Sequence, residues 1–154
     1  MPTFKLIDGA LAPYTEEAPV EIALAEWRAG ARPEAGRFAL ALPNDADVTE
    51  VVDSLYKFSA IVLDFPTFRD GRAYSQARLL RERCGYRGEI RARGEVLRDQ
   101  AYFMARAGFD AFEIDAASAA AFSAALGEFS VVYQPAADSA EPAWRRRAAR
   151  AIAA

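Results

Sequence analysis

Residues that could bind or activate an anion fall in two loops, each of which follows a predicted strand. Asp70-Gly71-Arg72 comes after the apolar run at residues 60–63, and Arg93 and Glu95 lie at the end of the next run, 89–93. Arg72 beside the start of a helix would form an anion site, because its guanidinium and the free backbone N–H groups all donate hydrogen bonds. Asp70 and Glu95 are the candidate catalytic residues, as general bases, because carboxylates must supply acid–base chemistry in a chain without histidine.

The predicted ligand-binding set adds small and polar neighbours to the two arginines. Gly71 is expected to take a positive φ in a tight turn, and Ser75 lies in the first turn of the following helix. Gln134 follows the last predicted strand. The full set is Arg72, Arg93, Gly71, Ser75 and Gln134. A structural interpretation is the alternative, in which Asp70 closes the turn and Glu95 caps a helix.

Positive charge is gathered around these loops. Residues 65–112 hold 10 of the 17 arginines but only 6 of the 22 carboxylates, in a chain whose net charge is −3. A concentrated field of one sign attracts ligands of the other sign, so this segment is where an anion or an acidic partner is expected.

Several kinds of site are excluded by composition. The chain has no histidine and a single cysteine, Cys84, which rules out a Ser-His-Asp triad, a Cys-His pair or an intramolecular disulfide. No glycine-rich dinucleotide or phosphate loop and no paired-cysteine motif is present. No metal site is predicted, nucleic acid is not an expected partner, and the cofactor is left open.

Alternating apolar runs and helical stripes predict an α/β fold. Strands are expected at residues 37–42, 60–63, 89–93, 111–114 and 131–133, with helices at 48–58, 73–84, 97–107 and 117–126 between them. This pattern favours a mostly parallel sheet of about five strands, either open and three-layered or curved like part of a barrel. Residues 20–24 are a further candidate strand. Residues 1–135 are predicted to form one α/β domain and residues 136–154 a C-terminal tail, with Trp144 packing it against the domain.

Two arginines of the third predicted strand share one face. Arg91 and Arg93 are two residues apart, so their side chains point the same way. A covered arginine needs a carboxylate partner, and Glu89 and Glu113 are the nearest candidates. Arg91 is therefore expected to be structural, paired with Glu113 on a neighbouring strand, and Arg93 to bind the ligand.

No apolar run reaches the length of a membrane span, and the first residues lack the apolar core of a signal peptide. A cytoplasmic location is expected.

The same segment resembles a known bacterial family. Its pattern runs F-P-x-F-x-D-G-R at residues 65–72, Y-S-x-A-R-x-L-R at 74–81, G-E-[IL]-R-A at 88–92, G-[DE]-V-L-x-D-Q at 94–100 and M-x-R-x-G-F-D-x-F at 104–112. These motifs, with the later Tyr133-Gln134, resemble the signature of the bacterial domain of unknown function 934 family.

The resemblance implies a connection with sulfur metabolism. Members of the family are often labelled probable oxidoreductases, and their genes tend to lie beside those for sulfite reductase and sulfonucleotide reductase. The leading hypothesis is an accessory protein of assimilatory sulfate and sulfite reduction that binds an anionic ligand or partner reductase through Arg72 and Arg93. The alternatives are a free-standing oxidoreductase or lyase acting on a small oxyanion, with Glu95 or Asp70 as base, and a structural homo-oligomer.

Overall fold

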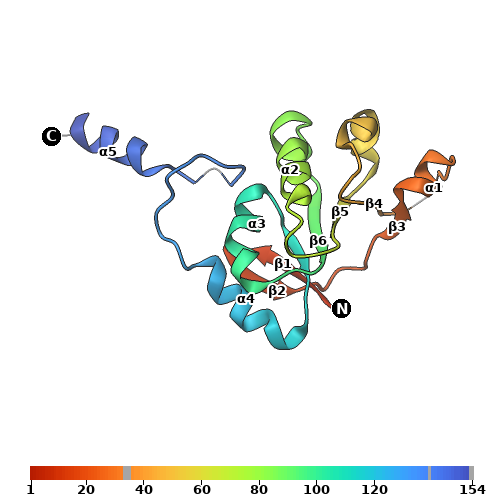
Figure 1. Cartoon of the computed structure of the whole chain (residues 1–154), viewed down its shortest axis with the longest axis horizontal. Helices are drawn as coiled ribbons and strands as arrows, with labels where there is room; N and C mark the ends of the chain where they lie inside the picture. Colours follow the sequence, from red (N-terminus) through yellow and green to blue (C-terminus); the bar gives the residue numbers. More distant parts are fainter. Residues whose placement is uncertain (33–35, 139, 153–154) are drawn as a thin grey trace.

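Five parallel strands follow one another across the sheet in the order in which they occur in the chain. The computed structural model describes residues 1–32, 36–138 and 140–152. The parallel strands are β3 (Val20–Ala23), β4 (Phe38–Leu42), β5 (Ala60–Phe65), β6 (Glu89–Gly94) and β7 (Ala111–Glu113). An antiparallel hairpin of β1 (Thr3–Ile7) and β2 (Ala10–Pro13) continues the sheet beyond β7, which gives the order β2-β1-β7-β6-β5-β4-β3 (Figure 1).

Helical segments connect the parallel strands and cover one face of the sheet. They are α1 (Leu24–Arg28), the 3-10 helix η1 (Val48–Lys57), α2 (Arg72–Arg78) with its π-helical extension η2 (Leu79–Arg83), η3 (Arg98–Gln100) with α3 (Ala101–Ala107), and η4 (Ala116–Ser118) with α4 (Ala119–Leu126). Right-handed crossovers between successive neighbouring strands put their helices on the same face. The buried side chains of α1 to α4 accordingly join those of the strands in one hydrophobic core. The predicted α/β class with a mostly parallel sheet is thus confirmed, with helices on one face and seven strands instead of about five.

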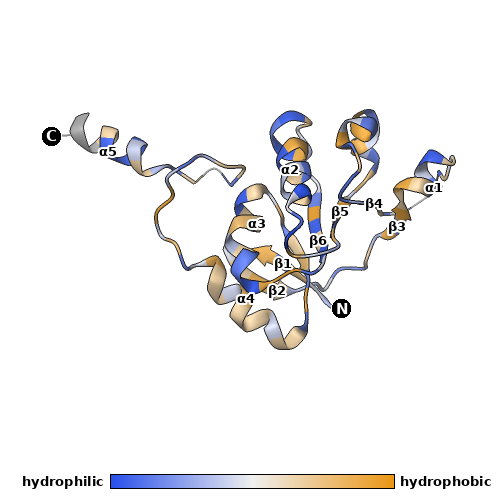
Figure 2. Ribbon diagram, viewed as in Figure 1, coloured by the Kyte–Doolittle hydropathy of each residue, from blue (hydrophilic) through white to orange (hydrophobic). Residues whose placement is uncertain are grey.

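The two faces of the sheet differ in side-chain chemistry. Ile61, Leu63 and Phe65 of β5 pack into the core under the helices, whereas the alternate residues Ala60 and Val62 belong to a small separate cluster on the other face. Figure 2 shows hydrophobic residues along the strands and on one side of α2, as expected for an amphipathic layer on a sheet. The face without helices, here called the helix-free face, instead carries charged side chains of β6 and its neighbours.

Four of the five expected strands are confirmed, and the candidate strand at residues 20–24 is present as β3. The expected strand at residues 131–133 is wrong, because no strand forms there. Its place beside β7 is occupied by β1, which pairs antiparallel through Phe4 with Phe112 and through Lys5 with Ala111. Val132 is buried without joining the sheet.

The hairpin that takes this place turns at Asp8-Gly9. Both residues have positive φ, 50° and 83°, which is the geometry of a tight two-residue β-turn. The sequence signal of this hairpin is the Asp-Gly pair, with Phe4 and Leu6 before it and Leu11 after it.

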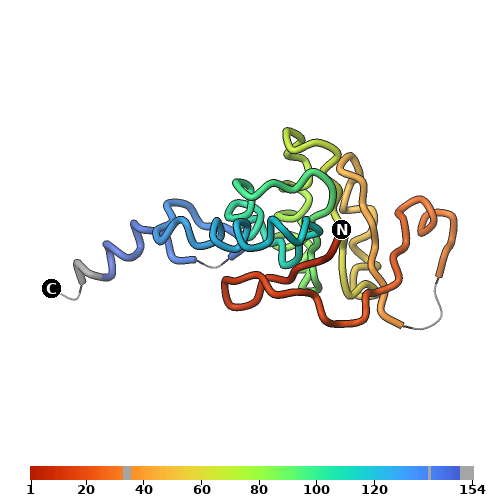
Figure 3. Tube along the Cα trace, turned by 90° about the horizontal axis from the view of Figure 1, so that it is seen from below, coloured from red at the N-terminus to blue at the C-terminus, as the bar shows by residue number. Residues whose placement is uncertain are grey.

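Residues 136–154, predicted as a tail, contain the helix α5 (Ala143–Ile152), which projects away from the sheet in both Figure 1 and Figure 3. Trp144 does not pack against the body as expected, since it is 51% exposed. Arg106 of α3 holds this segment instead: its Nε donates to Asp138 Oδ2 at 2.9 Å, and its carbonyl oxygen accepts from Ala137 N–H at 3.1 Å. The proposed boundary at residue 135 stays a prediction.

Candidate functional site

The loops that follow β5 and β6 meet at the carboxyl edge of the sheet, the edge formed by the carboxyl ends of the parallel strands. Glu95 Oε2 accepts a hydrogen bond from the N–H of Phe68 at 3.0 Å, and Gln100 Nε2 donates to the carbonyl oxygen of Phe68 at 2.9 Å. The backbone N–H of Glu95 also donates to Phe65 at 2.9 Å. Residues 66–71 and 95–97 therefore form one connected surface at the position where open α/β sheets bind ligands.

Asp70 and Arg72 form a bidentate ion pair on this surface. Arg72 Nη2 lies 2.6 Å from Asp70 Oδ2, and Arg72 Nε lies 3.0 Å from Asp70 Oδ1. The hydrogen bonds from Arg72 lower the pKa of Asp70 to about 2. Asp70 is therefore ionised at neutral pH, as a base must be, but its lone pairs are already engaged by Arg72.

Gly71 does not have the positive φ that was expected. Its φ is −83°, and a Cβ built on it would meet only Tyr74, at 3.9 Å. The glycine that the edge requires is Gly94, whose φ is 104°. A Cβ on Gly94 would lie 2.3 Å from the carbonyl oxygen of Phe65, because β5 and β6 run side by side there. The positive φ expected at Gly71 is wrong because Gly71 leads directly into helix α2, which begins at Arg72.

Arg93 lies on the helix-free face near the carboxyl end of β6, where two carboxylates neutralise it. Its Nε donates to Asp64 Oδ1 at 2.8 Å, and its Nη1 lies 2.5 Å from Glu21 Oε1 on β3. These contacts raise the pKa of Arg93, and the largest cause is the hydrogen bond that Arg93 donates to Asp64. A ligand at Arg93 would have to displace or share these carboxylates.

The structure does not bring the remaining predicted residues into the same site. Ser75 is exposed on α2 and shares a surface groove with Arg78 and Glu82. Gln134 follows α4 instead of a strand, and its carbonyl oxygen accepts a hydrogen bond from Arg106 Nη2. Asp70, Gly71, Arg72 and Glu95 do share the carboxyl edge. The catalytic and ligand-binding roles of all these residues stay predictions.

Ion pairing divides the arginine-rich segment into two groups. Within the described chain, carboxylates pair with six of its ten arginines: Arg72, Arg78, Arg81, Arg91, Arg93 and Arg106. No ion pair to described residues is made by Arg69, Arg83, Arg87 or Arg98. Of these four, Arg69 and Arg98 belong to the carboxyl edge, so the charge available for binding there lies on residues that the sequence did not single out.

Exposed hydrophobic residues accompany the two free arginines of the edge. Phe68 is 43% exposed and Leu97 is 42% exposed, although each belongs to a loop held by defined hydrogen bonds. A cavity of about 310 Å³ opens next to Arg98, with Ile114 and Phe122 among its apolar lining. Arginine beside exposed aromatic and aliphatic side chains is a composition typical of binding surfaces.

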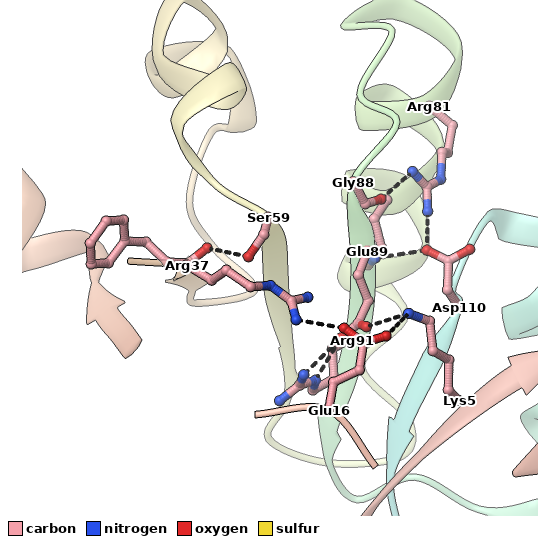
Figure 4. A network of polar contacts seen from close by, with 11 residues as sticks. Lys5, Glu16, Arg37, Ser59, Arg81, Gly88, Glu89, Arg91 and Asp110 are labelled. Carbon is pink, nitrogen blue, oxygen red and sulfur yellow. Dashed lines mark hydrogen bonds and ion pairs between the residues drawn. The ribbon is translucent and has the colours of Figure 1, made fainter. Parts of the chain in front are cut away.

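The helix-free face holds a buried ion network, seen from close by in Figure 4. Arg91 is 6% exposed and donates from Nε and Nη2 to Glu89 Oε1 at 3.0 and 2.7 Å. Glu113 on the adjacent strand β7 lies 3.8 Å from Arg91 Nη1, which agrees with the predicted pairing, although Glu89 is the closer partner. Burial raises the pKa of Glu113.

Residues from the amino-terminal part of the chain complete this network. Lys5 of β1 lies 3.6 Å from Glu89 and 3.4 Å from Glu16, and Glu16 also pairs with Arg37 at 2.5 Å. Three cations and three carboxylates thus balance one another when Arg91 and Glu113 are included. We interpret the network as a structural link between the hairpin and the parallel strands, because its positive and negative charges are equal in number.

Arg81 forms a second link at the amino ends of the strands. Its guanidinium donates to the carbonyl oxygens of Tyr86, Gly88 and Gly108 and to the carboxylate of Asp110. The loop around Gly88 is therefore part of an extensive polar network (Figure 4). No local pattern in the sequence indicates this pairing, because Asp110 is 29 residues from Arg81 along the chain.

The described side chains give little support for a reactive thiol or a metal site. Burial raises the pKa of the Cys84 thiol, which disfavours a reactive thiolate. In residues 1–32, 36–138 and 140–152, no group of three or more cysteines and carboxylates is placed to hold a metal ion. Over the same ranges, no helix combines the length and the apolar character needed to cross a membrane. The cytoplasmic location stays a prediction.

Comparison with known proteins settles the family. Residues 39–144 match the family described as Bacterial protein of unknown function (DUF934). The chain belongs to this family. The matched region begins at the second residue of β4, includes β5 to β7 and both loops of the carboxyl edge, and leaves out the β1–β2 hairpin. No curated protein and no solved structure matches the chain.

Proposed function

We propose that this member of the DUF934 family is an accessory protein of assimilatory sulfate and sulfite reduction. It binds an anionic ligand or a partner reductase through the carboxyl edge of its sheet. The sequence resemblance suggests the metabolic setting, and the observation that supports the surface is the placement of Arg69 and Arg98. Neither forms an ion pair with described residues, and each lies next to an exposed hydrophobic residue, Phe68 or Leu97.

The proposed binding surface uses Arg69 and Arg98 instead of Arg72 and Arg93. Arg72 and Arg93 keep carboxylate partners at 2.6 and 2.8 Å, so an incoming anion gains little from them without breaking an ion pair. Arg69 and Arg98 require no such exchange. A guanidinium free of internal partners can form bidentate hydrogen bonds with an oxyanion or with a carboxylate of another protein.

A protein partner accounts for the hydrophobic residues better than a small oxyanion alone. Sulfite and sulfate offer only oxygen atoms to bind, whereas Phe68 and Leu97 gain from being removed from water. Arginine and aromatic residues together are also enriched among the residues that dominate protein–protein affinity. The partner of this proposal is therefore a reductase with an acidic rim around an apolar patch.

Affinity capture from an extract of the bacterium that carries the gene, with identification of the captured proteins, tests the proposal. We expect sulfite reductase or sulfonucleotide reductase to be recovered with the wild-type chain and lost with the double variant Arg69→Glu/Arg98→Glu. Arg83→Glu is the matched control, because Arg83 is also unpaired among described residues but lies at the opposite end of the sheet. Recovery of neither reductase with the wild type would refute the function, and equal recovery with the double variant would refute the surface.

A further inference from the structure

A second cavity lies away from the carboxyl edge, between the segment that follows α1 and the end of η1. Its volume is about 430 Å³, which is within the range of small-molecule sites. The lining residues that the structure describes include four aromatic side chains and two cations: Trp27, Phe38, Tyr56, Phe58, Arg32 and Lys57. No carboxylate is among the described lining residues.

Trp27 and Phe58 form the rigid base of this cavity. Their ring centroids are 4.9 Å apart with an interplanar angle of 72°, and both side chains belong to the hydrophobic core. The guanidinium carbon of Arg32 lies 3.7 Å from the centroid of the Trp27 ring. A cation at this distance is attracted by the ring's π electrons, so the position of Arg32 is defined by Trp27.

Backbone contacts also orient Arg32 and leave part of its guanidinium unoccupied. Arg32 Nη1 donates to the carbonyl oxygens of Trp27 and Ala31, both at 2.8 Å. Its Nε and Nη2 have no acceptor among the described residues. The neighbouring Arg28 differs, because Glu50 neutralises it at 2.6 Å.

Lys57 brings a second positive charge to the same cavity. Its Nζ lies 5.6 Å from the Trp27 ring and 5.5 Å from the Tyr56 ring, and it forms no ion pair with described residues. Tyr56 is 80% exposed, although a large aromatic ring gains by leaving water. A flat, negatively charged molecule would fit an exposed ring beside two cations that form no ion pair with the described part of the chain.

We propose that this cavity binds a planar aromatic anion. The ring of the ligand packs against Tyr56 and Phe38, and its oxyanion accepts hydrogen bonds from the free N–H groups of Arg32 and from Lys57. A mononucleotide and an aromatic carboxylate share this chemistry. A bare inorganic anion would leave the aromatic lining unused. The site is separate from the carboxyl edge and does not depend on the function proposed there.

Tryptophan fluorescence gives a direct assay, because Trp27 is one of only two tryptophans in the chain. In the full chain with Trp144→Phe, Trp27 alone reports on the cavity. The probes are adenosine 5′-monophosphate and benzoate. The control compounds are adenosine, which lacks the negative charge, and inorganic phosphate, which lacks the aromatic ring. We expect saturable changes with at least one of the two aromatic anions, at concentrations at least about tenfold lower than for adenosine or phosphate, a difference of about 1.4 kcal/mol.

The variants Arg32→Gln and Arg28→Gln test the residues, with affinity also measured by calorimetry because Arg32 itself contacts the reporting ring. Arg32→Gln should weaken binding about tenfold or more, whereas Arg28→Gln should leave it unchanged, with matching thermal unfolding of both showing that they fold. Equal loss in the two variants would overturn the assignment to Arg32. The proposal as a whole is overturned if neither aromatic anion saturates the signal below about 10 mM.

Discussion

Neutralising Glu89 should be among the most destabilising single changes on the sheet. Arg91 is 6% exposed, and both of its hydrogen bonds to a carboxylate go to Glu89 Oε1, at 3.0 and 2.7 Å. In Glu89→Gln, Glu113 is the one carboxylate partner that Arg91 keeps among the described residues, at 3.8 Å without a hydrogen bond. Removing one member of a buried ion pair costs roughly 3–5 kcal/mol, a large part of the roughly 5–15 kcal/mol that stabilises a domain.

Glu113→Gln is the matched comparison. It also removes a carboxylate near Arg91, but Arg91 then retains its short bonds to Glu89, so the expected cost is only about 0–1 kcal/mol. Burial already raises the pKa of Glu113, which means that its charged form is not well stabilised in the folded protein. The free energy of unfolding in urea, measured for wild type and both variants, gives the two costs directly.

The double variant Glu89→Gln/Arg91→Met completes the test. Replacing both members of a buried pair is far less costly than breaking it, so the double variant should be more stable than the sum of the single changes predicts. If Glu89→Gln and Glu113→Gln lower the free energy of unfolding by the same small amount, Arg91 has access to water and the ion network does not hold the hairpin to the parallel strands.

Two further predictions concern the loops of the carboxyl edge. Gly94→Ala should lower the free energy of unfolding by about 1–3 kcal/mol, because φ is 104° at this position and the new Cβ would meet the Phe65 carbonyl. Gly71→Ala should have little effect, and equal effects of the two changes would refute the assigned backbone geometry. The pKa of Asp70, followed by NMR of its carboxyl group, should be about 2 and should rise toward 3.8 in Arg72→Gln. Because the pKa of Asp70 is lower in the folded protein, the stability that this ion pair contributes is present above pH 3.8 and is lost as the pH falls through about 2. If the pKa of Asp70 is the same in Arg72→Gln as in the wild type, Arg72 is not the cause of the lowered pKa.

The parallel part of the fold could be predicted because its signals are local. The strand at residues 60–65 is continuously apolar, and helix η1 places Val48, Val51 and Leu55 on one buried side, as their spacing indicates. The strand expected at 131–133 failed for a non-local reason: β1, more than 100 residues earlier in the chain, occupies the edge of β7. Three apolar residues carry no information about that competition.

The candidate site was less predictable than the fold, since ion pairing depends on contacts distant in the sequence. Arg93 was expected to bind a ligand, but Glu21, 72 residues away along the chain, accepts a hydrogen bond from it on the helix-free face. Arg91 was correctly expected to be structural because its two carboxylate candidates are on its own strand and the next one. Four arginines of the segment form no ion pair with described residues, and the two of them at the carboxyl edge, Arg69 and Arg98, can be recognised only once the partners of the other arginines are known.

The affinity of the purified protein for a purified reductase of sulfite assimilation tests the central proposal most directly. Calorimetric titration should show saturable binding for the wild type and for Arg83→Glu. Binding should be at least about tenfold weaker for Arg69→Glu/Arg98→Glu, since each charge reversal places a carboxylate against an acidic rim. Phe68→Ser should weaken binding as well, while the melting temperatures of all variants stay close to that of the wild type. Wild-type affinity in the double variant would contradict the assigned surface, and the absence of binding by the wild type to either reductase would contradict the proposed function.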